Sequence, residues 1–173
     1  MKLRQKLIYP AAAGALYAVL TVVLSPISYG PVQCRVSEAL CVLPFFLPEC
    51  AVGLALGCAA ANAFSAAGLP DVLVGAAATL TAGLLTARLG RTYRRTGVRP
   101  SFGRRLAAAM MPVIVNALLV GAMLAALYMP RGLFAESWLL FGAQVAAGET
   151  AAMLTLGVPF MRLIPRLLHT GFV

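Results

Sequence analysis

Residues 36–67, VSEALCVLPFFLPECAVGLALGCAAANAFSAA, decide the fold, because their length leaves the number of membrane crossings open. At about 1.5 Å per residue, these 32 residues are far too long for one transmembrane helix. They are also short for two helices of about 20 residues each. Leu47-Pro48-Glu49 lies near the middle, and proline interrupts a helical pattern there. Two short helices, at 36–47 and 49–67, would fit this break.

The composition around this stretch is that of an integral membrane protein. Only 11% of residues are charged, 61% are hydrophobic and the mean hydropathy is +0.90, so polar surface is too scarce for a soluble globule. The first apolar stretch could also be a signal peptide, but it is longer than a usual signal core and no A-x-A site precedes Tyr29, so we expect a retained helix. The clear candidate spans are 9–27, 71–89, 106–129 and 138–163.

The positions of the basic residues decide whether residues 36–67 cross the membrane once or twice. A net charge of +9 can indicate nucleic-acid binding, but here the basic runs flank apolar stretches, as cytoplasmic loops do, so no nucleic-acid partner is expected. The amino terminus and residues 88–105 are both basic, so both should be cytoplasmic, with an even number of crossings between them. Residues 36–67 must then form two helices. The sequence predicts one all-α domain, residues 1–173, with six transmembrane helices and both termini cytoplasmic.

Most catalytic and energising chemistry is missing from the sequence. Both lysines lie within the first six residues, so no G-x-x-x-x-G-K-[ST] loop can bind ATP phosphates. The single histidine, His169, lies near the carboxyl end, which disfavours histidine metal sites and histidine-dependent catalysis within the membrane. The four cysteines show no C-x-x-C spacing and are expected to pack as small apolar residues. We therefore expect a protein that is not an enzyme, without a cofactor or a metal site.

A polar cluster follows the first predicted helix. Polar groups at membrane depth are costly, so they are usually kept for ligand contact or structural pairing. Gln33, Arg35 and Glu38 fall within six positions and could form the wall of a pocket that opens outward. Arg35 and Glu38 are three residues apart, however, so on one helix they would share a face and could simply pair. Asn62, in a later helix, is interpreted as a packing residue.

The last two predicted helices carry further ligand-binding candidates. Glu149 is expected to face the bundle interior, either to bind a ligand or to pair with an arginine or an amide. Asn116 could bind the ligand or form a hydrogen bond between helices. Gln144 and Trp138 are weaker candidates, and Trp138 could equally be an interfacial anchor. Asp71 marks a helix start, where an acid suits the positive end of the helix dipole, and is interpreted as structural.

These motifs together resemble the QueT family, the substrate-binding S components of energy-coupling factor (ECF) transporters for queuosine precursors. The resemblance covers nearly the whole chain, and its first motif is the most specific. It rests on GPVQCRVSEAL at 30–40, LPFF at 43–46, Asp71 with Ala77, Thr79 and Leu80, PVIVNA at 112–117, GE at 148–149 and LGVP at 156–159.

The resemblance implies partners and a bacterial or archaeal plasma membrane as well as a fold. A six-helix S component in the lipid bilayer would capture its ligand from the outer face and work with a transmembrane T component and two cytosolic ATPase subunits. The energy would come from those ATPases, which agrees with the missing nucleotide loop. Ala11 and Ala15, four residues apart on the first helix, would form the small-residue track that docks on the T component.

The implied ligand is a deazapurine, 7-aminomethyl-7-deazaguanine or its 7-cyano relative. Glu149 or Glu38 would accept hydrogen bonds from the donor edge of the guanine-like ring. Arg35 and Gln33 would complete the outer wall. Three alternatives stay open: an S component for another vitamin or nucleobase, a stand-alone secondary transporter, and a small membrane scaffold protein. A coupling-ion site would be needed for the second, and the sequence shows no inverted repeat.

Overall fold

The computed structural model of the protein describes residues 3–29 and 34–169, and every regular element in these ranges is helical. The predicted all-α class is therefore confirmed for this part of the chain. In order, the elements are α1 (Leu3–Val23), α2 (Ser25–Ser28), the 3-10 helix η1 (Val36–Phe45), α3 (Cys50–Asn62), α4 (Leu69–Leu89), α5 (Arg91–Thr96), α6 (Phe102–Tyr128), the 3-10 turn η2 (Arg131–Leu133), α7 (Phe134–Ala152), the π-helical segment η3 (Met153–Gly157) and α8 (Val158–His169).

Six apolar helical stretches fall where the six transmembrane helices were expected. Three of those described have the length and composition to cross a membrane, namely Leu69–Leu89, Phe102–Tyr128 and Phe134–Leu167. Three are shorter, namely Leu7–Val23, Val36–Phe45 and Cys50–Asn62. The structure thus supports a protein with several membrane-spanning helices, and the count of six crossings stays a prediction.

The predicted boundaries differ most from the structure in two regions. Residues 36–47 were expected as a short α-helix, but η1 is a 3-10 helix, which rises about 2.0 Å per residue and is rarely as long as its ten residues. Pro44 lies inside η1, and a proline lacks the N–H that an α-helix would use there. Residues 138–163 were expected as one helix, but the wider turn of η3 separates α7 from α8.

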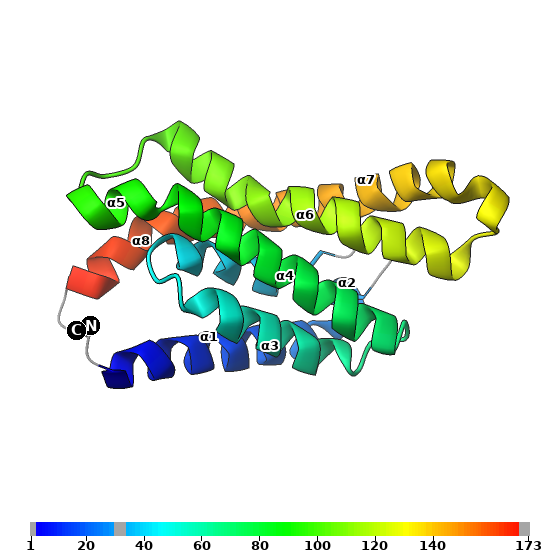
Figure 1. The fold of residues 1–173 in the computed structure, drawn as a ribbon, viewed down its shortest axis with the longest axis horizontal. Helices are drawn as coiled ribbons and strands as arrows, with labels where there is room; N and C mark the ends of the chain where they lie inside the picture. Colours follow the sequence, from blue (N-terminus) through cyan, green and yellow to red (C-terminus); the bar gives the residue numbers. More distant parts are fainter. Residues whose placement is uncertain (1–2, 30–33, 170–173) are drawn as a thin grey trace.

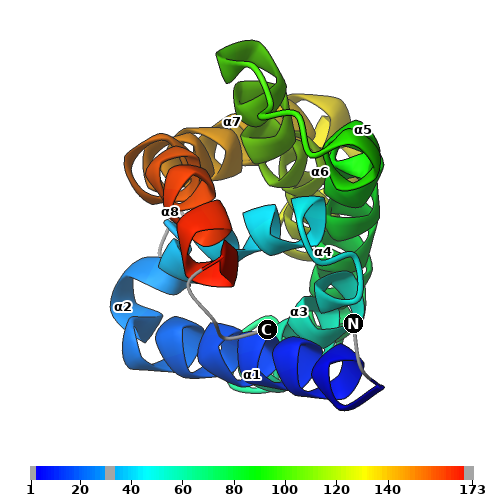
Figure 2. The same cartoon turned by 90° about the vertical axis from the view of Figure 1, so that its left-hand side faces the viewer.

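Five helices form an incomplete ring around η1. Helices α1, α3, α4, α6 and α7 pack in this order, each against the next. The view along the bundle in Figure 2 shows η1 (cyan) inside this ring, and η1 contacts all five helices as well as η3 and α8. Eight of its ten residues are buried. The polar residues at the start of η1 are therefore held in the interior of the bundle.

Glycines allow α1 and α3 to cross at backbone contact. A Cβ atom added to Gly14 would overlap the carbonyl oxygen of Gly53, and one added to Gly53 would overlap the carbonyl oxygen of Pro10. Gly57 meets the carbonyl oxygen of Gly14 in the same way. Small residues permit such a close approach where lipid supplies no hydrophobic force between helices. The tight crossing fixes α1 beside η1.

The two ends of the bundle are formed by different elements. The start of α1, the basic helix α5 and the end of α8 lie at one end, on the left in Figure 1, and the tip of the α6–α7 hairpin lies at the other. Arg94 of α5 donates hydrogen bonds to the carbonyl oxygens of Phe45, at 2.6 Å, and Ala87, at 2.8 Å. Partial burial lowers the pKa of the Arg94 guanidinium from its ordinary value. Arg94 thereby ties the end of η1 to α4 and α5.

Candidate functional site

Glu38 is the acid of the polar cluster, and it is fully buried. It lies in the first turn of η1, and its carboxylate is buried between α1 and η1. The Tyr17 hydroxyl donates to Oε1 at 2.5 Å, and the Cys41 thiol donates to Oε2 at 3.0 Å. Both carboxylate oxygens therefore already have a donor from the protein.

A second contact aligns the same two elements. The Thr21 hydroxyl lies 2.6 Å from the Ser37 Oγ and 2.9 Å from the Tyr17 carbonyl oxygen, to which it donates. Thr21 and Ser37 are both fully buried, so neither hydroxyl could go without a partner at low cost. The pair holds the start of η1 against the middle of α1.

Glu149 and Asn116 form a hydrogen-bonded pair between α6 and α7. The Asn116 Nδ2 donates to the Glu149 Oε1 at 2.7 Å, and both side chains are buried. Among the described residues, the Glu149 Oε2 and the Asn116 Oδ1 have no hydrogen-bond partner. Glu149 also lies close enough to Glu38 and Arg35 to interact with them electrostatically. The pair therefore presents two buried oxygen acceptors that remain unused in this part of the chain.

Arg35 forms its ion pair with a residue that the sequence analysis had interpreted as structural. Its Nη2 lies 3.5 Å from the Asp71 Oδ1, and the side chains are only 2% and 3% exposed. Asn62 donates to the same Asp71 oxygen at 3.2 Å and to the Asp71 backbone carbonyl at 2.9 Å. The Arg35 guanidinium also lies 5.9 Å from the centre of the Tyr29 ring. This second cluster joins the start of η1 to α3 and α4.

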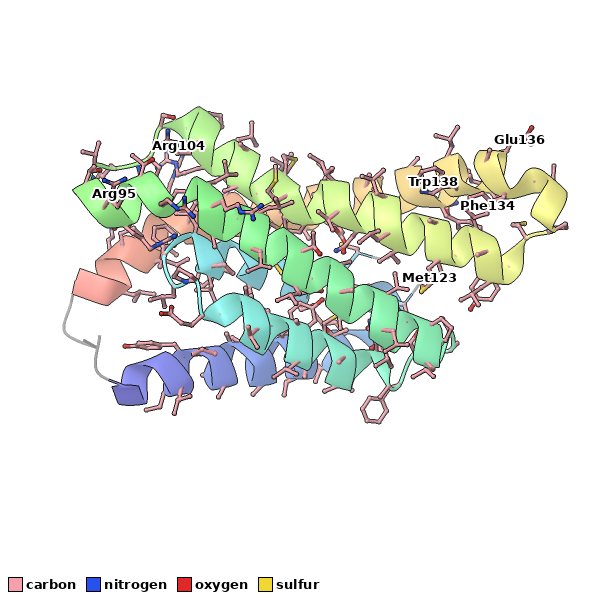
Figure 3. The ribbon with its side chains drawn as sticks, viewed as in Figure 1. Arg95, Arg104, Met123, Phe134, Glu136 and Trp138 are labelled. Atoms are coloured by element: carbon pink, nitrogen blue, oxygen red, sulfur yellow. The ribbon has the colours of Figure 1, made fainter. Side chains whose placement is uncertain are left out.

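The structure separates the remaining predicted site residues. Gln33 lies outside the described residues, and Gln144 is half-buried on α7. Trp138 is 36% exposed, stands with Phe134 near the α6–α7 tip and donates from its indole nitrogen to the Leu118 carbonyl at 3.0 Å. Figure 3 shows it at the end of the bundle opposite Arg95. Trp138 precedes Glu149 by eleven residues of α7, about 16 Å along the helix axis, so the two do not meet.

Ala11 and Ala15 lie on the outer surface of the bundle. Both are exposed, and they line a shallow apolar groove of about 420 Å³ between α1 and α3. Gly14, Val52 and Leu56 line the same groove. The predicted small-residue track therefore faces outward, where another helix could reach it.

Four residues of the two clusters were missed as site residues by the sequence analysis: Tyr17, Cys41, Asn62 and Asp71. A signal existed for two of them. Tyr17 places a hydroxyl in the middle of an apolar helix, and a buried hydroxyl needs a hydrogen-bond partner. Asp71 is a carboxylate in a chain with five acids and a basic residue, Arg35, at another helix boundary. Which acid would pair with that arginine depends on the fold.

Comparison with known proteins identifies related sequences. A curated protein of Lactococcus lactis subsp. cremoris (strain MG1363), described as "Queuosine precursor transporter QueT", is 43% identical over 72 residues. The aligned part spans 40% of this chain and 42% of that relative. No solved structure matches the chain. The family model described as "QueT transporter" matches residues 7–166, and the chain therefore belongs to the QueT transporter family.

Proposed function

We propose that this protein is the substrate-capture subunit of an ATP-driven ECF-type importer and that it binds a queuosine precursor, 7-aminomethyl-7-deazaguanine, in the interior of the bundle. Membership of the QueT transporter family and the name of the L. lactis relative support the substrate class. The paired Glu149 and Asn116, with one unused acceptor each among the described residues, carry the proposal.

Glu149 is the better of the two glutamates for reading the guanine-like edge. That edge presents adjacent N–H donors, which need oxygen acceptors close together. The Glu38 carboxylate already accepts one hydrogen bond on each oxygen, whereas the Glu149 Oε2 accepts none from the described residues. A carboxylate acceptor gives a stronger hydrogen bond than a neutral one. Glu149 therefore binds the donor edge, and Asn116 fixes the orientation of its carboxylate.

The charges of the interior favour the aminomethyl form of the precursor over the cyano form. The fully buried charged residues among those described are Arg35, Glu38, Asp71 and Glu149. One arginine faces three carboxylates, and a buried charge without a counter-charge is costly. The ammonium group of 7-aminomethyl-7-deazaguanine supplies a positive charge that the cyano compound lacks. Glu38, close to Glu149, is the group that it would meet.

The remaining site candidates have more peripheral roles in this proposal. Arg35 belongs to the wall toward the outer face, Gln33 stays a candidate for the same wall from the sequence alone, and Gln144 lies on the same helix as Glu149. The exposed position of Trp138 favours the interfacial anchor over ligand contact. The groove at Ala11 and Ala15 is the docking surface for the transmembrane T component, through which two cytosolic ATPases drive import.

Calorimetric titration of the protein purified in detergent tests the ligand. We expect saturable binding of 7-aminomethyl-7-deazaguanine, weaker binding of the 7-cyano compound, and no heat from guanine, riboflavin or biotin. The Glu149→Gln variant keeps an acceptor for Asn116 but loses the charge, so the affinity should fall about 10- to 100-fold. Glu136→Gln, at the exposed tip of α6–α7 in Figure 3, is the matched control and should bind normally.

Two results would change the assignment. Unaltered affinity in Glu149→Gln would return Glu149 and Asn116 to a structural role. Binding of a control vitamin in place of the deazaguanine would favour an S component for another vitamin or nucleobase, with the same partners.

A further inference from the structure

A basic cavity lies at the end of the bundle that carries α5. It has a volume of about 600 Å³ and lies between α8 and the segment that joins α5 to α6. Four arginines line it, Arg99, Arg105, Arg162 and Arg166, together with Tyr93 and Met161. The volume is in the range of ordinary small-molecule pockets. Nothing in the proposed import of a deazapurine uses this cavity.

The lining of the cavity is basic. No acidic side chain of the described residues lines it. Three of the five acids, Glu38, Asp71 and Glu149, are buried in the polar clusters of the interior. The Nε of Arg105 is buried and has no hydrogen-bond partner among the described residues. A guanidinium with an unsatisfied buried N–H, beside other arginines, is suited to an anion with several oxygen acceptors.

The surroundings of the cavity point to a lipid as the source of that anion. Exposed apolar side chains alternate with its arginines along the chain: Val98 precedes Arg99, Phe102 lies one helical turn before Arg105, and Leu163 follows Arg162. A soluble anion has no use for an apolar rim. A phospholipid places its phosphate among basic residues at the membrane surface and its acyl chains on the apolar side chains next to them.

We propose that this cavity is a binding site for the phosphate of an anionic phospholipid such as phosphatidylglycerol. Arg105 and Arg162 bind the phosphate from the two walls, α6 and α8, and Arg99 adds charge from the connecting segment. Val98, Phe102 and Leu163 contact the acyl chains. An occupied site would fix α8 to α6 at this end of the bundle.

Native mass spectrometry of the delipidated protein, titrated with dioleoylphosphatidylglycerol or dioleoylphosphatidylcholine, tests the proposal. We expect phosphatidylglycerol to bind at least about tenfold more tightly than the zwitterionic lipid, because each arginine contributes about a fivefold gain in affinity for an anionic headgroup. The Arg105→Gln, Arg162→Gln double variant should lose about 25-fold in affinity for phosphatidylglycerol on the same basis. Each single variant should lose about fivefold, which keeps the test available if the double variant fails to fold.

The matched control is the Arg95→Gln, Arg104→Gln double variant. It removes the same charge from the same end of the bundle, but both arginines are exposed and neither lines the cavity (Figure 3). We expect its affinity for phosphatidylglycerol to stay within about twofold of the parent protein. An equal loss in both double variants would overturn the proposal in favour of general surface attraction, and so would no loss in either.

A competition experiment separates lipid phosphate from free phosphate. Millimolar inorganic phosphate should leave phosphatidylglycerol bound, because it cannot use the apolar rim. Displacement of the lipid by inorganic phosphate would show that the cavity is a site for a soluble anion, and the lipid assignment would be wrong. The deazaguanine titration serves as an independent readout: the lipid-site variants should bind the deazaguanine normally, and Glu149→Gln should bind phosphatidylglycerol normally.

Discussion

Arg35 shows how a single residue links distant parts of this protein. By sequence spacing its nearest acid is Glu38, three positions away, and a pair within one helix was a reasonable alternative. In the structure the ion pair goes to Asp71, 36 positions away, while Glu38 is held by Tyr17 and Cys41. Asp71 therefore does more than favour the start of α4: it forms an ion pair with a buried guanidinium.

We predict that Asp71→Asn destabilises the protein by about 3 kcal/mol. The substitution keeps the shape of the side chain and an oxygen for Asn62, but it breaks the buried ion pair with Arg35. Thermal unfolding in detergent, followed by circular dichroism, measures the loss. Glu136→Gln removes an exposed acid and should leave the unfolding temperature unchanged.

A second substitution separates the charge effect from other consequences of Asp71→Asn. Combining it with Arg35→Met removes the other charge of the broken ion pair, so the double variant should recover part of the lost stability relative to Asp71→Asn alone. If Asp71→Asn had no effect on stability, the ion pair would contribute little, and pairing of Arg35 with Glu38 would again be the better interpretation.

The α1–α3 crossing is the element-scale feature on which the position of η1 depends. Pro10, Gly14, Gly53 and Gly57 bring the two backbones into direct contact, and Tyr17 of α1 then reaches Glu38. Widening this crossing would move the donor of a buried carboxylate. Packing at the surface of the bundle and geometry at the polar cluster are thus connected through one pair of helices.

We predict that Gly53→Ala destabilises the protein by about 1–3 kcal/mol, because the new methyl group overlaps the Pro10 carbonyl oxygen and forces the helices apart. Gly103→Ala is the matched control. Gly103 lies near the start of α6 with no atom within 4 Å of an added Cβ, so alanine there should stabilise the helix by about 0.5–1 kcal/mol. Thermal unfolding of both variants measures the expected loss of stability in Gly53→Ala and the expected gain in Gly103→Ala. A neutral Gly53→Ala would mean that the crossing is looser than the structure has it.

Element by element, the sequence predicted α4 and α6 best, because each is a long apolar run with clear ends. Pro70 and Asp71 mark the first turn of α4, and Ser101 caps α6 by accepting a hydrogen bond from the backbone N–H of Arg104. The 3-10 conformation of η1 was not predictable from hydropathy, because a segment that is buried on nearly all sides is apolar throughout in either kind of helix. Pro44 disfavours an α-helix there, and the packing of η1 among its neighbours is a property of the assembled bundle.

At the scale of the whole molecule, the distribution of basic residues predicted which helix ends lie on the same side, and the hydropathy of single segments could not. The basic amino terminus and residues 88–105 were expected on one side of the membrane, and the start of α1 and α5 do lie at the same end of the bundle (Figure 1). The polar clusters were only partly predictable. Glu149 and Glu38 stand out in any apolar sequence, but their partners Asn116 and Tyr17 depend on which helices become neighbours.

Three single substitutions to cysteine test the orientation of this bundle in the membrane directly. Phe64 lies in the turn between α3 and α4, Val98 between α5 and α6, and Gly132 between α6 and α7, and none of the three positions is buried. Six crossings with both termini inside place Phe64→Cys and Gly132→Cys outside and Val98→Cys inside. A membrane-impermeant maleimide should label the first two in intact cells and the third only after permeabilisation. The parent chain, with its half-buried Cys34, measures the background.

Labelling of Phe64→Cys decides whether residues 36–67 cross the membrane once or twice. If that stretch crossed the membrane only once, the α3–α4 turn would lie on the cytoplasmic side of a chain that starts there, and Phe64→Cys would be protected in intact cells. Labelling of Val98→Cys alone in intact cells would keep six crossings but reverse the bundle, against the basic charge of α5. Labelling of Phe64→Cys and Gly132→Cys from opposite sides would contradict the fold itself, because both turns lie at the same end of the bundle (Figure 1).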